Sequence, residues 1–306
     1  MAPIASRIRQ LLGGRSDTRI RQPEPVPRHG MSLSDFQYLY DRDLLNIECS
    51  GEWSLDPAEF RGPDDALSAG YRTAVLDGWR SITTRDVYDP VESESFEVEL
   101  AEHLPRPFPF TTRDQRQVAH YLGAVAAAIG RLPSAPPARV VEYGAGWGHL
   151  ALACASTGFQ TTAVDINAAS VDLLRTRAAK LDVPLDVVRA SFLDYEPDDL
   201  VDAILFFESF HHCDDPWLLL DRCVSSLRPG GRLLFVADAI YEGFHAPWGV
   251  RLDGQAAYMA RRFGWLELGF EREFFLAQLE RRGLVVETGY SDYLGPYGAY
   301  ISADLP

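Results

Sequence analysis

The stretch Arg139-Val140-Val141-Glu142-Tyr143-Gly144-Ala145-Gly146-Trp147-Gly148 decides the fold of this chain. Its first half carries a β-branched apolar pair, which is typical of a buried parallel strand. Glycines at alternate positions then allow a sharp turn and let the backbone approach a ligand closely. A helix that begins at His149 would direct its first N–H groups to the same place. We therefore predict a strand, a turn and a helix with a ligand at the turn.

The spacing of the glycines bears on which ligand this is. The dinucleotide fingerprint G-x-G-x-x-G would need glycine at the position of His149. The spacing G-x-G-x-G, with an acid two residues before the first glycine, resembles motif I of class I S-adenosylmethionine (SAM)-dependent methyltransferases. The resemblance implies that SAM is the cofactor and that Glu142, Gly144, Gly146 and Gly148 form part of its site. An oxidoreductase of the nucleotide-sugar or NAD type, which also uses a glycine turn, is an alternative.

Composition and charge limit the possible functions. The 306 residues, 46% of them hydrophobic, suffice for one large domain with a smaller appended region. The net charge of −15 argues against a nucleic-acid substrate. The four cysteines (Cys49, Cys154, Cys213 and Cys223) stand far apart without C-x-x-C spacing, which fits a reducing cytoplasm without a zinc site or disulfides. No apolar run approaches the roughly 20 residues of a membrane span. We expect a cytoplasmic protein that acts on a small molecule.

The composition changes along the chain and predicts its organisation. Residues 1–30 are rich in arginine and end in a Pro-rich run, so we expect a basic N-terminal tail. Residues 31–110 are acidic and aromatic, and we expect an accessory region that covers the cofactor or substrate side. Residues 111–306 would form the methyltransferase domain, beginning with a helix capped by Thr111 or Thr112. Within it, the aromatic and arginine-rich insertion at 238–270 predicts a substrate lid, with a packed aromatic core as the alternative.

Strand patterns recur after the glycine turn. Further strands are predicted at residues 160–164, 185–188, 202–207, 232–236, 284–287 and 297–301. The turn Leu227-Arg228-Pro229-Gly230-Gly231 before the fifth strand is a further mark of the resembled family, and the resemblance covers roughly residues 115–302. It implies an α/β fold of Rossmann-like type. We expect a seven-stranded, mostly parallel sheet with helices on both faces and a last antiparallel strand.

Residues after the second strand extend the cofactor site. Asp165 ends that strand, where a carboxylate can accept hydrogen bonds from both hydroxyls of a ribose. The family places its ribose-binding acid there, and we assign the neighbouring Ile166 to the cofactor site as well. A capping acid beside Asn167, which itself is expected to cap the next helix, is the alternative for Asp165.

Two further segments complete the predicted cofactor site. After the third strand the family carries an acid and then a hydrophobic residue beside the adenine, and this chain has Ser191 and Phe192. Phe192 can pack on the ring, and Asp194 can replace the missing acid. Glu208, after the fourth strand, can contact the methionine end of the cofactor or orient a histidine.

His211 and His212 are the candidate catalytic residues. They follow the fourth strand, at the carboxyl edge where open α/β sheets bind ligands. If the methyl acceptor is a hydroxyl, its proton must leave, and a neutral histidine is a natural base near pH 7. We predict that one of the two is this base. A metal site that uses Asp214 and Asp215 is the alternative, but these acids fit the start of a helix better, so we expect no metal.

A second resemblance concerns the methyl acceptor. Residues 245–254 and 263–270 resemble bacterial methyltransferases associated with glycan assembly. This resemblance implies an O-methyltransferase that acts on a sugar or a nucleotide-linked sugar in polysaccharide biosynthesis. A secondary metabolite as acceptor and a SAM-binding subunit without activity are the alternatives. Nothing in the sequence indicates the oligomeric state.

Overall fold

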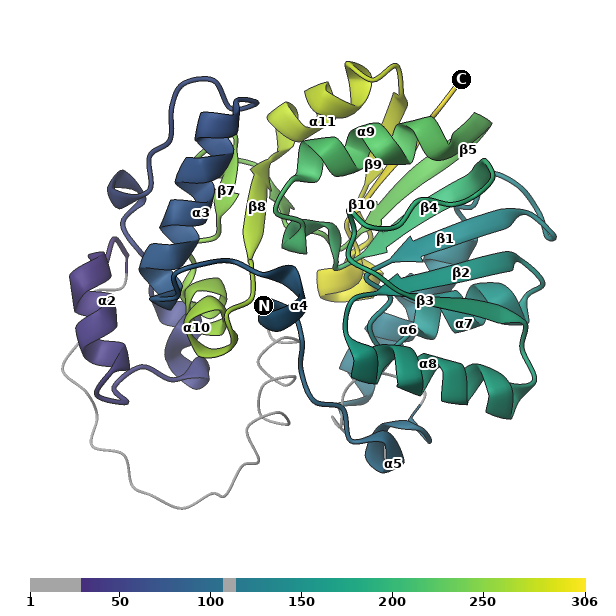
Figure 1. The fold of residues 1–306 in the computed structure, drawn as a ribbon, viewed down its shortest axis with the longest axis horizontal. Helices are drawn as coiled ribbons and strands as arrows, with labels where there is room; N and C mark the ends of the chain where they lie inside the picture. Colours follow the sequence, from purple (N-terminus) through teal and green to yellow (C-terminus); the bar gives the residue numbers. More distant parts are fainter. Residues whose placement is uncertain (1–28, 107–113) are drawn as a thin grey trace.

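A computed structural model describes residues 29–106 and 114–306 of the chain. Most of the predicted basic tail (residues 1–28) lies outside the described residues, as do Thr111 and Thr112. The described chain consists of a large α/β unit and a smaller body beside it (Figure 1). We call this smaller body the cap, and it comprises residues 31–96 and 238–270.

The large unit is built on a seven-stranded sheet. Its strands are β1 (Arg139–Tyr143), β2 (Gln160–Asp165), β3 (Leu185–Arg189), β4 (Val201–Phe207), β5 (Leu227–Val236), β9 (Val285–Gly289) and β10 (Tyr300–Asp304). Their order is β3-β2-β1-β4-β5-β10-β9, and of these seven strands β10 alone runs in the opposite direction to the other six. This confirms the predicted fold class. β5 begins earlier than expected because Leu227 already pairs with Val201 at the start of β4, and the register shifts before Arg232 pairs with Ala203.

Helices cover both faces of this sheet. The helices α6 (Gln115–Ile129), α7 (His149–Ser156) and α8 (Ala168–Leu181) pack on one face, and α9 (Pro216–Ser226) and α11 (Arg272–Glu280) pack on the other. Side chains that alternate along β1 serve both layers, since Val140 packs in the α6 cluster and Val141 in the α9 cluster. Asp114 caps α6, and Asn167 caps α8 as predicted.

The cap joins two segments that lie far apart in the sequence. The first carries α2 (Leu33–Tyr40), the 3-10 helices η1 (Ile47–Glu52) and η2 (Pro57–Glu59), and then α3 (Ala69–Thr83) and α4 (Pro90–Ser93), and is followed by α5 (Leu100–His103). The second carries β6 (Ile240–Tyr241), β7 (Trp248–Val250), α10 (Gly254–Phe263) and β8 (Leu268–Glu271), whose strands form a small sheet in the order β6-β8-β7. Figure 1 shows α2, α3, α10, β7 and β8 together to one side of the large sheet, with α2 outermost.

Hydrogen bonds show that the two segments share one core. The Leu55 N–H donates to the Leu252 carbonyl at 2.8 Å, and Trp248 Nε1 donates to the Ala66 carbonyl at 2.7 Å. Trp79 is completely buried in this core, and Trp248 is 1% exposed. The accessory region and the insertion therefore form one body.

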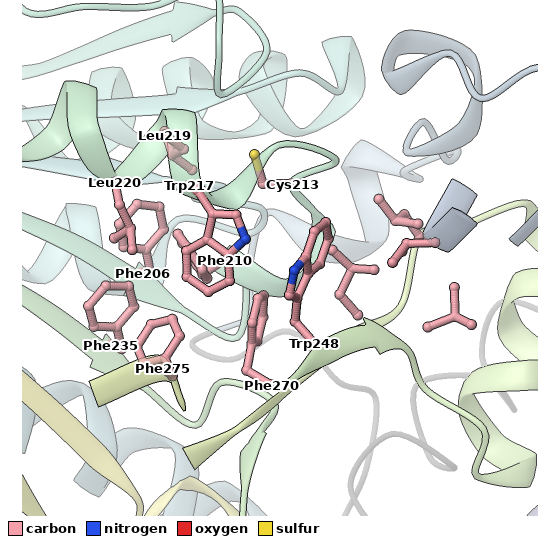
Figure 2. Packing of buried hydrophobic residues seen from close by; sticks show 14 of the residues in the cluster. Phe206, Phe210, Cys213, Trp217, Leu219, Leu220, Phe235, Trp248, Phe270 and Phe275 are labelled. Carbon is pink, nitrogen blue, oxygen red and sulfur yellow. The ribbon is translucent and has the colours of Figure 1, made fainter. Parts of the chain in front are cut away.

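An aromatic cluster fastens the cap to the large sheet (Figure 2). Phe235 on β5 and Phe270 on β8 both pack against Phe210, at ring-centroid distances of 5.2 and 5.5 Å. Phe210 is fully buried and begins the short helix η3 (Phe210–His212). A further 3-10 helix, η4 (Asp292–Tyr297), precedes β10. Because Phe210 is anchored in this core, the two histidines that follow it have a fixed place at the edge of the sheet.

Two further observations concern the described ranges. None of their helices combines the length and the apolar character needed to cross a bilayer. Cys154, Cys213 and Cys223 are buried free thiols. The structure thus shows no disulfide among these three residues.

Candidate active site

A cavity of about 380 Å³ lies at the carboxyl ends of β1, β2 and β4, between the large sheet and the cap. Eight of the predicted site residues line it: Gly144, Gly146, Asp165, Ile166, Ser191, Phe192, Glu208 and His212. The cap contributes Pro90, Glu94, Phe96 and Trp265 to the opposite side. The volume is within the roughly 300–1,000 Å³ that is usual for small-molecule sites.

Three predicted site residues lie behind the cavity and do not line it: Glu142, Gly148 and His211. Gly148 starts α7 at φ +72°, and a Cβ there would lie 1.9 Å from Leu174. Glu142 accepts a hydrogen bond from the backbone of Ala151, and burial raises its pKa to about 8. Its Oε2 has no hydrogen-bond partner within residues 29–106 and 114–306. Glu142 and Gly148 therefore shape the turn from behind.

Asp165 is tied directly to the glycine turn. The Gly146 N–H donates to Asp165 Oδ2 at 2.6 Å, and the Asn167 N–H donates to Oδ1 at 2.8 Å. Burial raises the pKa of Asp165 to about 6, although both of these hydrogen bonds lower it. The carboxylate is thus largely ionised at pH 7, and each oxygen keeps accepting capacity for a further donor. The cap of α8 is Asn167, so Asp165 remains available to a ligand.

The residues after β3 form the next part of the cavity wall, at the position where the resembled family carries an acid. Ser191 Oγ donates to Asp194 Oδ2 at 2.6 Å, and both residues line the cavity. Phe192 lines it as well and packs edge-on against Tyr143 at 6.1 Å. Asp194 therefore lies where it can supply the carboxylate that Ser191 lacks.

Glu208 has an unusual backbone conformation. Its φ of +51° lies in the left-handed region, which costs a residue with a side chain roughly 1–2 kcal/mol. The Glu208 N–H donates to the Val236 carbonyl at 2.9 Å, which holds this conformation at the end of β4. Strained residues of this kind cluster at functional sites. Glu208 lines the cavity.

His212 is the histidine that faces the cavity. Its Nδ1 lies 3.2 Å from Glu94 Oε2, an ion-pair contact without the alignment of a full hydrogen bond. Burial lowers the pKa of His212, but the carboxylates of Glu94, Glu267 and Asp238 outweigh this and raise the pKa to about 9. His212 therefore carries a proton at neutral pH in the protein without cofactor.

His211 is held in a second acid–histidine pair. Its Nδ1 lies 2.7 Å from Asp238 Oδ1, and the same carboxylate accepts hydrogen bonds from the backbone N–H groups of His211 and Phe210. Burial raises the pKa of Asp238 to about 7. On its other side, His211 Nε2 lies 3.8 Å from Glu267 Oε2. His211 thus stands behind His212 and supports the wall.

Three side chains are close enough together to hold a metal ion, but they are not the set that includes Asp214 and Asp215, which the sequence suggested as an alternative. His211, His212 and Glu267 each place one ligand atom within 4.8 Å of the others. Asp214 instead pairs with Arg72, and Asp215 caps α9. Glu267 is already paired with Arg251 at 3.2 Å, and each imidazole faces a carboxylate. Each of His211, His212 and Glu267 therefore already has an oppositely charged or hydrogen-bonding partner from the protein.

The insertion contributes less to the cavity than its composition suggested. Trp265 lines the cavity, whereas Trp248 is buried in the cap core. Arg251 pairs with Asp253 and Glu267, and Arg261 pairs with Asp41. For most of these side chains the packed-core alternative therefore describes the structure better than a pocket lining.

Sequence reasoning missed an aromatic wall. The ring of Phe96 lies 5.8 Å from Trp147 and 6.1 Å from Trp265, and all three residues line the cavity. Glu94 was missed as well. No motif marks Phe96 or Glu94, because their partners belong to distant segments and meet them only in the folded chain.

Comparisons with known proteins agree with this architecture. Residues 141–235 match the family model described as "Methyltransferase domain". Ubiquinone biosynthesis O-methyltransferase from Xanthomonas campestris is 35% identical over 100 residues, which are 32% of this chain and 42% of that protein. The protein of the same name from Xylella fastidiosa is 32% identical over 107 residues, or 34% of this chain and 44% of that one. The chain thus spans less than half the length of these curated relatives.

A solved structure resembles a larger part of the fold. The magnesium protoporphyrin IX methyltransferase from Synechocystis, solved with bound SAM, superimposes with a TM-score of 0.50. The match covers 72% of this chain and 100% of that one at 13% identity, so it bears on the fold alone. Residues 141–235 therefore resemble a methyltransferase domain, and the seven-stranded sheet that contains them has the same fold as this SAM-bound methyltransferase.

Proposed function

We propose that the protein transfers a methyl group from SAM to a hydroxyl of a small polar acceptor. One observation carries the proposal: a single cavity holds the glycine turn and Asp165 together with His212. The nucleoside-binding and proton-accepting elements of such a reaction are therefore neighbours. The sequence predicted these elements separately: the glycine turn follows β1, Asp165 ends β2 and His212 follows β4.

The residues present fit SAM. A Cβ at Gly146 would have Gly144 O, at 3.9 Å, as its nearest neighbour, so the space above this glycine is open to the cavity. Asp165 offers a carboxylate to ribose hydroxyls, and Phe192 with Asp194 offers a ring and an acceptor for the adenine. Glu208 supplies negative charge that suits a cationic cofactor. When bound, SAM supplies a methyl group on a sulfonium, whose leaving thioether is neutral.

The chain's own contribution is orientation, exclusion of water and removal of a proton. The cap closes the cavity opposite the glycine turn, so the acceptor is held next to the cofactor side. With Nδ1 of His212 facing Glu94, Nε2 is the nitrogen left for an acceptor hydroxyl. A positively charged sulfonium nearby would lower the pKa of His212 from about 9 towards neutrality. His212 then serves as the base, and His211 supports it from behind.

For the acceptor, we propose a sugar or glycan precursor, with a secondary metabolite as the alternative. The support is the resemblance of residues 245–254 and 263–270 to methyltransferases of glycan assembly. Curated relatives are named ubiquinone biosynthesis O-methyltransferases, which favours O-methylation without naming a sugar. None of the described residues lining the cavity is Arg or Lys, which favours a small uncharged acceptor over a nucleic acid. A cytoplasmic location is part of the same proposal.

The test is methyl transfer from radiolabelled SAM to a panel of purified acceptors. The panel contains neutral glycosides, nucleotide-linked sugars and phenols, and each assay is repeated with His212→Gln. Labelled product with the wild type that is strongly reduced in the variant supports the proposal. Hydride transfer with NAD would favour the oxidoreductase alternative. Tight SAM binding without transfer to any cellular extract would favour the silent subunit.

A further inference from the structure

Glu94 connects three parts of the molecule. It follows α4 in the N-terminal region, and its Oε1 accepts hydrogen bonds from Tyr88 Oη at 2.9 Å and from the Leu266 N–H of the insertion at 2.8 Å. Its Oε2 faces His212 Nδ1 of the methyltransferase domain at 3.2 Å. Two donors from the cap thus fix the carboxylate whose other oxygen meets the histidine.

The burial of this contact gives it weight. The side chain of Glu94 is 12% exposed and that of His212 is 23% exposed, so solvent screens the pair only in part. Other charged or titratable groups around His212 are Tyr88, whose hydroxyl donates to the His212 carbonyl at 3.3 Å, and Glu267, Asp238, Asp165 and the neighbouring His211. Unlike these groups, Glu94 makes a direct contact to a ring nitrogen of His212.

We propose that Glu94 is a positioning residue for methyl transfer, through which the N-terminal region completes the active site. This inference rests on the proposed function. A carboxylate on Nδ1 keeps the proton on that nitrogen and leaves the lone pair on Nε2, the arrangement that makes a histidine a competent base. Catalytic contacts of this kind are often poorly aligned before the ligands bind and tighten in the complex.

The carboxylate also balances charge during the reaction. As the acceptor oxygen forms its bond to the methyl carbon, the bond from that carbon to sulfur breaks and the thioether leaves without charge. The hydroxyl proton passes to Nε2, and the imidazolium that results is stabilised by Glu94 until the proton leaves to solvent. Without Glu94, the sulfonium and a forming imidazolium would stand close together with less negative charge beside them.

The experiment is a pH titration of the full chain labelled with ¹⁵N-histidine, followed by NMR, for the wild type and Glu94→Gln. His212→Gln identifies the signals of His212 among the seven histidines. The matched control is Glu97→Gln, which removes an exposed acid from the same segment. Binding of S-adenosylhomocysteine, measured by calorimetry, accompanies every variant and tests the cofactor site separately.

In the wild type we expect His212 to titrate well above 6.5, with its neutral form protonated at Nδ1. In Glu94→Gln we expect its pKa to fall by at least about one unit, a tenfold change in the protonation equilibrium. Turnover should fall about tenfold or more, while S-adenosylhomocysteine affinity stays within about twofold. Glu94→Asp, which keeps the charge, should restore part of the pKa, and Glu97→Gln should match the wild type.

An unchanged pKa and tautomer of His212 in Glu94→Gln would overturn the inference, even if that variant were less active. A variant that fails to fold leaves the wild-type titration decisive: a His212 pKa at or below 6.5, or a neutral form protonated at Nε2, would overturn it as well. Absence of S-adenosylhomocysteine binding to the wild type would instead count against the proposed function. The two failures are therefore distinguishable.

Discussion

The backbone N–H of Gly146 donates a hydrogen bond of 2.6 Å to the carboxylate of Asp165. This bond joins the turn after β1 to the end of β2, the two features that the sequence assigns to a nucleoside-bearing cofactor. It makes the position of the acid depend on the shape of the glycine turn. A change at either residue is therefore expected to act on cofactor binding before it acts on the fold.

Gly146→Val should abolish the binding of SAM and S-adenosylhomocysteine. The space above Gly146 is open to the cavity, so a valine side chain would occupy the cofactor's place, and the φ of +52° adds strain. Calorimetric titration with S-adenosylhomocysteine measures the effect.

Gly230→Val is the matched control for this substitution. Gly230 also has a positive φ, +79°, but has open space around it and does not line the cavity. Both variants should lose roughly 1–2 kcal/mol of unfolding free energy from backbone strain. Gly230→Val should still bind the cofactor, and wild-type affinity in Gly146→Val would refute the assignment of the turn.

Glu142→Gln should change how stability depends on pH. The pKa of Glu142 rises from 4.5 to about 8 on burial, so between these values the folded protein holds a proton that the unfolded chain has released. Folding free energy is therefore lost as the pH rises from 4.5 to 8, and the full cost is present above pH 8. The glutamine has no charge to bury.

Chemical unfolding of both proteins from pH 5 to 9 tests this. Relative to the wild type, Glu142→Gln should gain on the order of 1–3 kcal/mol across that range. Asp238 also has a raised pKa but is present in both proteins, so it cancels in the difference, whereas Asp165 raises the pKa of Glu142 and contributes through that coupling. A stability difference that stays constant with pH would contradict the assignment of a raised pKa to Glu142.

The pH dependence of turnover should report His212. Because a base must lose its proton before it accepts another, turnover should rise with pH as His212 is deprotonated, and the midpoint should lie at or below about 9. His212→Gln should lower turnover by about 100-fold or more and remove this limb, with cofactor affinity nearly unchanged. The measurement is kcat against pH with an acceptor found in the panel.

His211→Ala provides the comparison. Since His211 stands behind the cavity wall, its loss should lower turnover less than the loss of His212 and should leave the pH limb in place. Unaltered turnover in both variants would remove the proposal that a histidine acts as the base.

The sequence predicted the large sheet well because its signals are local. Val140 and Val141, the glycine turn and Asn167 determine strand, turn and helix start through neighbouring residues alone, and the structure shows each of them in that role. The cap was not predicted as one body. Its strands β6, β7 and β8 have between two and four residues, which is too short for a periodic pattern.

The candidate site shows the same division. Asp165 and His212 follow strands of the sheet and could be placed by motif and topology, whereas Glu94 follows a four-residue helix with no motif. Glu94 reaches the site only because Tyr88 and Leu266 hold it there. Glu142 lies behind the turn because the alternation along β1 directs its side chain to the helix layer on that face.

Chelation should leave the activity unchanged. Each donor of the set formed by His211, His212 and Glu267 is already part of a charge pair, so a divalent cation would have to displace Arg251 and the protons on the imidazoles. Elemental analysis of the purified protein and assays with and without EDTA test this. One retained equivalent of metal, together with loss of activity on chelation, would contradict the account.

The most direct test of the central claim is a parallel calorimetric titration of the purified protein with SAM, S-adenosylhomocysteine and NAD. The account predicts that both adenosyl-sulfur compounds bind with one site per chain and that NAD does not compete with them. Binding of NAD alone would contradict the assignment of the glycine turn and of Asp165 to a methyl-donor site.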